Sequence, residues 1–184
     1  MKIVGISGSL RMGSFNSALL RAAQAVAPED MEIEIASIAD LPPYNADVQA
    51  EGFPVAVERL VERIRQADGV LIATPEYNYS IPGVLKNAID WVSRADDQPF
   101  NGKAVAIMGA SRGFLGTARA QYHLRQVFVF LNALVMNRPE VFVGTAHDKH
   151  DEAGNLTHEG TREFLASYLK AVREWVDRVN RTRA

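Results

Sequence analysis

The chain has 184 residues, a formal net charge of −2 and no cysteine. This length suits a single domain, residues 1–184, with a full hydrophobic core. The charge gives no electrostatic case for nucleic-acid binding, and the lack of cysteine excludes a disulfide framework, a thiolate nucleophile and an iron–sulfur cluster. No stretch approaches the ~18 apolar residues of a membrane span. The first apolar run is too short for a signal peptide, so we expect a cytoplasmic protein.

Short apolar runs typical of buried strands alternate with segments of helical periodicity. The strand-like runs are residues 3–7, 32–37, 70–73 and 104–108, then 134–136 and 141–143 as fifth-strand material interrupted at Pro139. The helix-like segments are residues 16–27, 53–64, 82–92, 117–132 and 164–179. Residues 41–52 are expected to form a loop, and residues 147–158 an exposed hairpin or loop. This alternation predicts an α/β, flavodoxin-like three-layer sandwich with a five-stranded parallel sheet of order 2-1-3-4-5 and helices on both faces.

The first loop, Gly8–Asn16, follows the first predicted strand and has the composition of a phosphate site. Its glycines let the backbone approach an anion, and the start of the next helix supplies amide donors and a favourable dipole. The side-chain donors are Ser9, Arg11, Ser14 and Asn16. The spacing matches neither the dinucleotide G-x-G-x-x-G nor a Walker A sequence. The alternative is that Ser14 or Asn16 only caps the helix and Arg11 is a solvated charge.

The second loop, Pro75–Gly83, follows the third predicted strand and is rich in aromatic and polar groups. Tyr77 and Tyr79 can present ring faces or edges to a flat ligand, and a proline at each end restricts the loop, so less entropy is lost on binding. The polar groups are Glu76, Asn78 and Ser80. Alternatively, the tyrosines pack on the surface or at a subunit interface, and Glu76 is a helix cap or a salt-bridge partner.

The third loop, Gly109–Thr117, follows the fourth predicted strand and is rich in glycine. Small residues let a ligand ring lie close to backbone amides, which stabilise developing negative charge. Arg112 either attracts the phosphate of a nicotinamide cofactor or is simply exposed. Loops at the carboxyl ends of parallel strands line one crevice, and these three together suit a flat cofactor with a phosphate tail.

Three sequence stretches together resemble the NAD(P)H-dependent FMN reductase family, and within it the bacterial chromate and quinone reductases. They are GSLR-x-GS-x-N in the first loop, PEYN-x-S-x-PG-x-LKNAIDW from Pro75 to Trp91, and AQYHLRQ from Ala120 to Gln126. The resemblance covers nearly the whole chain. It implies a flavodoxin-like fold, non-covalently bound FMN, and a homodimer or homotetramer with the flavin near a subunit interface.

The resemblance also implies where the cofactor lies. The phosphate end would be held by Ser9, Arg11, Ser14, Phe15 and Asn16. The isoalloxazine would be flanked by Pro75, Glu76, Tyr77, Asn78 and Tyr79, with Ser80 close by and Ser111 and Gly113 near the ring. A hydride would pass from NADPH or NADH to FMN, and two electrons would then reduce a quinone or a similar small-molecule acceptor such as chromate, a free flavin, or an azo or nitro compound. No side chain is assigned as catalytic.

Two other classes of function stay open at this point. A flavodoxin-type electron carrier is generally strongly acidic and lacks an arginine in the phosphate loop, so the charge of −2 and Arg11 argue against it. The second alternative is a non-enzymatic flavin-binding module. A metal site is not expected, because the spacing of His147 and His150 comes without a convincing third ligand.

Overall fold

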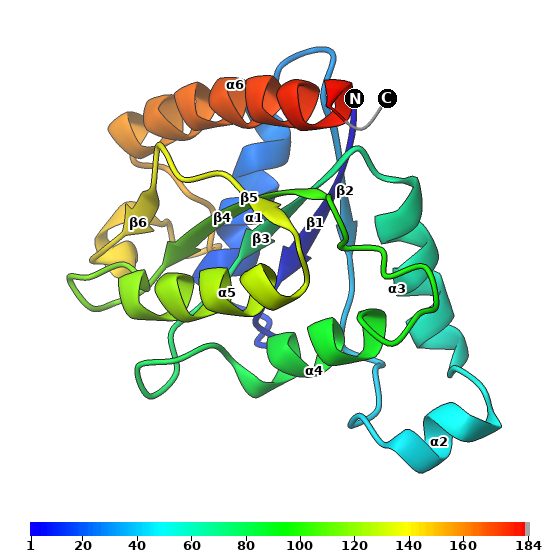
Figure 1. Cartoon of the computed structure of the whole chain (residues 1–184). Coiled ribbons are helices and arrows are strands. Elements are labelled where there is room, and N and C mark those ends of the chain that lie inside the picture. The colour runs from blue at the N-terminus through cyan, green and yellow to red at the C-terminus, as the bar shows by residue number, and fades with distance from the viewer. Residues whose placement is uncertain (183–184) are drawn as a thin grey trace.

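The computed structural model describes residues 1–182 and has the predicted architecture, a parallel sheet between two helical layers (Figure 1). The strands are β1 (Lys2–Ser7), β2 (Glu32–Ala36), β3 (Gly69–Ala73), β4 (Ala104–Ala110), β5 (Leu134–Val135) and β6 (Val141–Val143). The helices are α1 (Phe15–Ala25), α2 (Ala46–Glu51), α3 (Val55–Gln66), α4 (Gly83–Val92), α5 (Ala118–Phe130) and α6 (Glu159–Arg181), with a 3₁₀ turn, η1 (Ala146–Lys149). The order β2-β1-β3-β4-β5 confirms the predicted topology.

The sheet separates two hydrophobic cores, because successive side chains of a strand point to opposite faces. On β4, Ala104, Ala106 and Met108 pack in one core with helices α1 and α6. Val105 and Ile107 pack in the other core with α3, α4 and α5. β3 is buried along its whole length, which explains its continuous run of apolar residues. All pairings are parallel, so the loops after β1, β3 and β4 emerge at the same edge.

One detail differs from the sequence-based expectations, and a second extends the expected interruption of the fifth strand at Pro139. The expected loop 41–52 contains the short helix α2, which begins after Asn45 because the Asn45 side chain accepts a hydrogen bond from the Asp47 N–H. The fifth strand is split in two: β5 pairs with Ala104 and Val105, whereas β6 pairs with residues 108–110 of β4. Pro139 lies between them and has no N–H to contribute to a continuous ladder.

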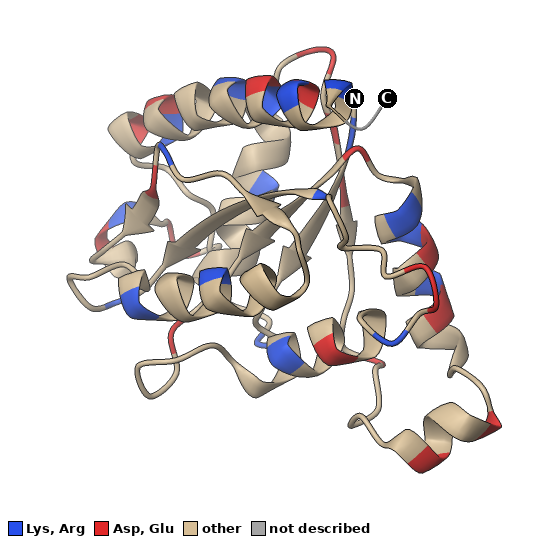
Figure 2. Cartoon of the chain, viewed as in Figure 1, with Lys and Arg blue, Asp and Glu red and all other residues tan. Residues whose placement is uncertain are grey.

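Charged residues of both signs lie along α3 and α6 (Figure 2). No helix within residues 1–182 is long and apolar enough to cross a membrane.

Candidate functional site

The three loops after β1, β3 and β4 meet at one cleft of about 420 Å³. Its lining residues are Ser9, Arg11, Ser14, Phe15, Asn16, Pro75, Glu76, Tyr77, Ala110, Ser111 and Arg112. Ligand pockets generally range from roughly 300 to 1,000 Å³, so the cleft has room for a cofactor. Nine of the predicted site residues line it, whereas Asn78, Tyr79, Ser80 and Gly113 lie outside this lining.

The first loop keeps several donors free for a ligand. Ser14 caps α1, because its hydroxyl accepts the N–H groups of Asn16 and Ser17. Among the residues that the structure describes, no protein acceptor faces four backbone N–H groups, those of Leu10, Met12, Gly13 and Phe15. Arg11 is exposed, with its guanidinium 5.7 Å from the centre of the Phe15 ring. Free amides at a helix start beside an arginine are the donor set that binds phosphate.

The side chain of Asn16 is hydrogen-bonded to the backbone of Ala110 rather than being a free phosphate donor. Its side-chain amide donates to the Ala110 carbonyl and its carbonyl accepts the Ala110 N–H, both at 2.9 Å. Asn16 is 2% exposed, so the pair ties the first loop to the end of β4 in a dry environment. The sequence predicted that Asn16 belongs to the site, and the structure shows that it joins two walls of the cleft.

His150 supports the first loop through the ring of Phe15. Its ring lies 4.8 Å from the Phe15 ring, and its Nδ1 is 2.6 Å from the Ala146 carbonyl oxygen. Burial lowers the pKa of His150 below its ordinary value of 6.5. The lowered pKa favours the neutral imidazole, which contacts the Ala146 carbonyl through Nδ1 and packs its ring against Phe15.

The second loop is a tight hairpin closed by its own backbone. Tyr77 and Ser80 exchange two N–H···O bonds of 3.0 Å, and the two residues between them, Asn78 and Tyr79, have φ angles of +51° and +65°. Two left-handed residues in a two-residue turn define a type I′ hairpin. The Tyr77 ring is 49% exposed and lines the cleft, which leaves it available for stacking on a flat ligand.

Glu76 anchors this hairpin to α5. Its Oε2 accepts the N–H groups of Arg119 and Ala120 at 3.1 and 3.2 Å, and its Oε1 lies 3.1 Å from Nη1 of Arg119. Thr117, at the start of α5, has a left-handed backbone and makes no side-chain cap. Both alternatives raised from the sequence therefore hold for Glu76: it is a helix cap and a salt-bridge partner. A second tie joins Ser80 Oγ to His123 Nδ1 at 3.0 Å.

The third loop approaches the cleft with its backbone. A Cβ at Gly109 would lie 1.9 Å from Thr117 Oγ1 and 2.6 Å from the Thr74 carbonyl oxygen, so only glycine fits there. The Ser111 hydroxyl donates to the Gly113 carbonyl at 3.0 Å, and the Ser111 N–H donates to Val143 of β6. Arg112, whose role the sequence left open, is exposed and lines the cleft.

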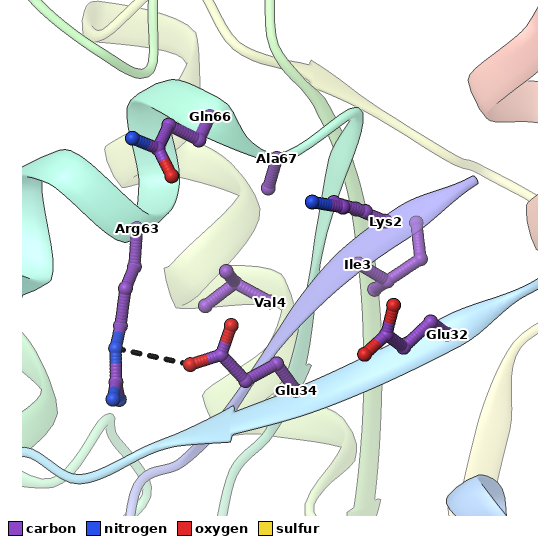
Figure 3. Close-up of a pocket in the computed structure, with 8 residues that line it drawn as sticks. All are labelled: Lys2, Ile3, Val4, Glu32, Glu34, Arg63, Gln66 and Ala67. Carbon is purple, nitrogen blue, oxygen red and sulfur yellow. Dashed lines mark ion pairs between the residues drawn. The ribbon is translucent and has the colours of Figure 1, made fainter.

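Two other cavities among the described residues have different linings. A cavity of about 80 Å³ lies between β1, β2 and the end of α3, at the amino end of the strands, and the Glu34–Arg63 ion pair crosses it (Figure 3). A wide, shallow depression of about 800 Å³ lies beside α3, where Arg65 pairs with Asp97. Within residues 1–182 there is no group of three or more His, Cys, Asp or Glu side chains that could hold a metal ion.

The sheet order and the cleft define a flavodoxin-like α/β protein in which a loop with glycine, serine and arginine lies beside an aromatic loop. The family model of the NADPH-dependent FMN reductases matches residues 1–148. The chain belongs to this family, as its sequence motifs predicted.

Similar proteins agree with that assignment. The chain is 55% identical over 179 residues to an NAD(P)H-dependent FMN reductase of Pseudomonas aeruginosa, covering 97% of each chain. It is 53% identical over 182 residues to a quinone reductase of Escherichia coli, again covering 97% of each. The solved structure of FerB, a flavoenzyme NAD(P)H:(acceptor) oxidoreductase from Paracoccus denitrificans, is 36% identical with a TM-score of 0.88, over 96% of this chain and 97% of that chain. The expected class, an NAD(P)H-dependent flavin oxidoreductase, is confirmed.

Sequence reasoning missed two residues. Ala110 lines the cleft through the backbone that Asn16 holds, and Arg119 touches the second loop from α5. Arg119 sits one position before the AQYHLRQ stretch that carried the resemblance. The charge at the start of a helix, where a cation is unfavourable, was the available signal that this arginine has a specific partner.

Proposed function

We propose that this protein binds FMN in the cleft and uses NAD(P)H to reduce quinones by two electrons. The observation that carries the proposal is that Arg11 and the exposed Tyr77 ring line one cleft, beside a first loop in which four backbone N–H groups have no protein acceptor among the described residues. The amides and the guanidinium fit a phosphate ester, and the tyrosine fits a flat, partly polar ring. The names of the similar proteins support the same chemistry.

Particular residues would hold the cofactor. Ser9, Arg11 and the amides around Gly13 would bind the phosphate, with Ser14, Phe15 and Asn16 shaping that end of the cleft. Pro75, Glu76 and Tyr77 would flank the ring system, with Asn78, Tyr79 and Ser80 forming the turn behind them, and Ser111 and Gly113 would approach from the third loop. Bound FMN supplies hydride acceptance from the nicotinamide and electron donation to the acceptor.

The chain's own part is binding, orientation and electrostatics. The third-loop backbone carries amide dipoles near the ring site, which favour negative charge. Arg11 of the first loop and Arg112 of the third loop both line the cleft. Their positive charges attract anionic nicotinamide cofactors. A quinone is favoured as acceptor because the first and third loops expose apolar side chains, those of Leu10, Met12 and Phe114. Chromate, free flavins, azo compounds and nitro compounds are further candidate acceptors.

We also propose a homodimer or homotetramer with the cleft near the subunit interface. Exposed apolar side chains also lie along α5, where Tyr122, Val129 and Phe130 are 55%, 77% and 88% exposed. Patches of this kind mark interaction sites. Sedimentation of the purified protein tests the assembly. A cytoplasmic location, where NAD(P)H is available, is proposed with it and is tested by cell fractionation.

The decisive test is the visible spectrum of the purified protein during anaerobic addition of NADPH and then benzoquinone. The proposal expects flavin absorption that bleaches with NADPH and recovers with the quinone. A flavin-loaded protein that NADPH cannot bleach would instead identify an electron carrier. A protein that takes up no FMN after incubation would overturn the cofactor site itself.

A further inference from the structure

Arg119 lies in the first turn of α5 and outside the lining of the cleft. Its guanidinium nevertheless touches the second loop at two points: Nη1 is 3.1 Å from Glu76 Oε1, and the central carbon is 3.9 Å from the centre of the Tyr79 ring. One side chain therefore bridges the residue before the hairpin turn and a residue within it.

The hairpin needs such external support. Tyr79 has a φ of +65°, a left-handed conformation that costs energy for residues other than Gly, Asn and Asp. The Tyr77 and Tyr79 side chains are 49% and 65% exposed, so little packing offsets that cost. Strained turns persist where the surroundings hold them in place, and on this side of the loop the surroundings are α5.

The charge of Glu76 provides a second reason. Its carboxylate lines the same cleft as Arg11, and it is only 12% exposed. An uncompensated carboxylate there would repel the phosphate of an incoming cofactor. The Arg119 guanidinium and the amides at the start of α5 compensate this charge.

We propose that Arg119 is a positioning residue that holds the second loop in its ligand-receiving conformation by bridging Glu76 and Tyr79. The part of this inference that concerns FMN affinity rests on the proposed function. The part that concerns the conformation of the hairpin applies to the protein without flavin. Because the planar guanidinium pairs with a carboxylate and stacks on a ring at once, lysine cannot replace it fully.

Backbone hydrogen exchange of the flavin-free protein tests the conformational part, read at the Tyr77 and Ser80 amides that close the hairpin. We expect Arg119→Ala to speed exchange at both amides about tenfold, the equivalent of roughly 1.4 kcal/mol. Arg119→Lys keeps the charge and should give a smaller increase. Arg125→Ala is the matched control, because Arg125 lies on the same helix but donates to Met136; it should leave both amides unchanged.

FMN affinity, measured by quenching of FMN fluorescence, gives the second readout. Arg119→Ala should raise the Kd of FMN about tenfold, and the effects of Arg119→Ala and Tyr79→Leu should be less than additive because the two side chains share one contact. Unchanged exchange at Tyr77 and Ser80 in both Arg119 variants would overturn the inference. If the wild-type protein bound no FMN, the proposed function would fail, while the exchange experiment would still judge the role of Arg119.

Discussion

The first loop leaves four backbone N–H groups without an acceptor in the part of the chain described, whereas the second loop closes its own turn and is tied to α5 through Glu76, Arg119 and Ser80. Both loops line one cleft. The backbone donors of the first loop are therefore available to an anion. The polar groups of the second loop form hydrogen bonds that maintain its conformation. Ligand binding should therefore depend on charge in the first loop and on conformation in the second.

Arg11→Ala should cause the largest change in FMN affinity. It removes a charge-assisted contact worth about 1.5–3 kcal/mol, so the Kd of FMN should rise on the order of 10–100-fold, measured by fluorescence titration. The rate of flavin bleaching by NADPH, per bound flavin, should change less. Arg21→Ala, an exposed arginine on α1, is the control. Equal FMN retention in the Arg11 variant would show that the phosphate lies elsewhere.

Glu76→Ala should act through stability instead. The variant leaves the Arg119 and Ala120 amides without their cap, and loss of a cap costs about 1–2 kcal/mol. Urea denaturation of the flavin-free protein should show this decrease. Glu76→Gln keeps one acceptor oxygen, so its free energy of unfolding should lie between those of the wild type and Glu76→Ala. An unchanged free energy of unfolding together with weakened FMN binding would mean that Glu76 contacts the ligand rather than supporting the loop.

Asn78→Ala tests how much the left-handed backbone of the hairpin turn contributes to stability. Asn tolerates the left-handed φ of +51° at this position, while Ala pays roughly 1 kcal/mol for it, so the free energy of unfolding in urea should fall by about that amount. Asn78→Gly serves as the control and should stay near the wild-type value. A variant with alanine as stable as the wild type would show that the turn relaxes at little cost.

Acid should weaken the support of the first loop. Because burial lowers the pKa of His150 in the folded chain, the unfolded chain takes up the proton first, and stability falls as the pH drops below the ordinary value of 6.5. His150→Phe keeps the ring beside Phe15 and should remove this part of the decrease between pH 7 and 5, as followed by thermal unfolding. The Asp30, Asp97 and Asp151 carboxyls, whose pKa values are lowered, contribute a separate loss below 3.8. Identical pH profiles for the two proteins would exclude the histidine effect.

The fold could be predicted because each buried strand is a continuous apolar run followed by a loop with glycine, proline or serine. β3, residues 69–73, shows this pattern fully. The three loops of the cleft could be found for the same reason. The split of β5 from β6 was visible only as an interruption at Pro139, since local sequence does not fix which residues of β4 each short strand pairs with.

The roles of individual site residues were harder to predict than their location. Asn16 bonds to Ala110, 94 positions away, and Glu76 caps a helix 43 positions away. These hydrogen-bond partners depend on how the helices and the sheet pack together and bring distant loops into contact. The spacing of residues along the sequence does not specify that packing. The left-handed Tyr79 was also unpredictable, because tyrosine has no preference for that conformation.

The double hydrogen bond between Asn16 and Ala110 has a consequence for how this scaffold can diversify. The two hydrogen bonds connect the first loop to the end of β4. The first and third loops therefore cannot move apart without breaking two buried hydrogen bonds. Bulkier acceptors should therefore be accommodated by changes at exposed positions of the first and third loops, such as Met12 and Phe114, which are 98% and 87% exposed. Directed evolution toward new substrates would do best to leave Asn16 fixed and randomise those outer positions.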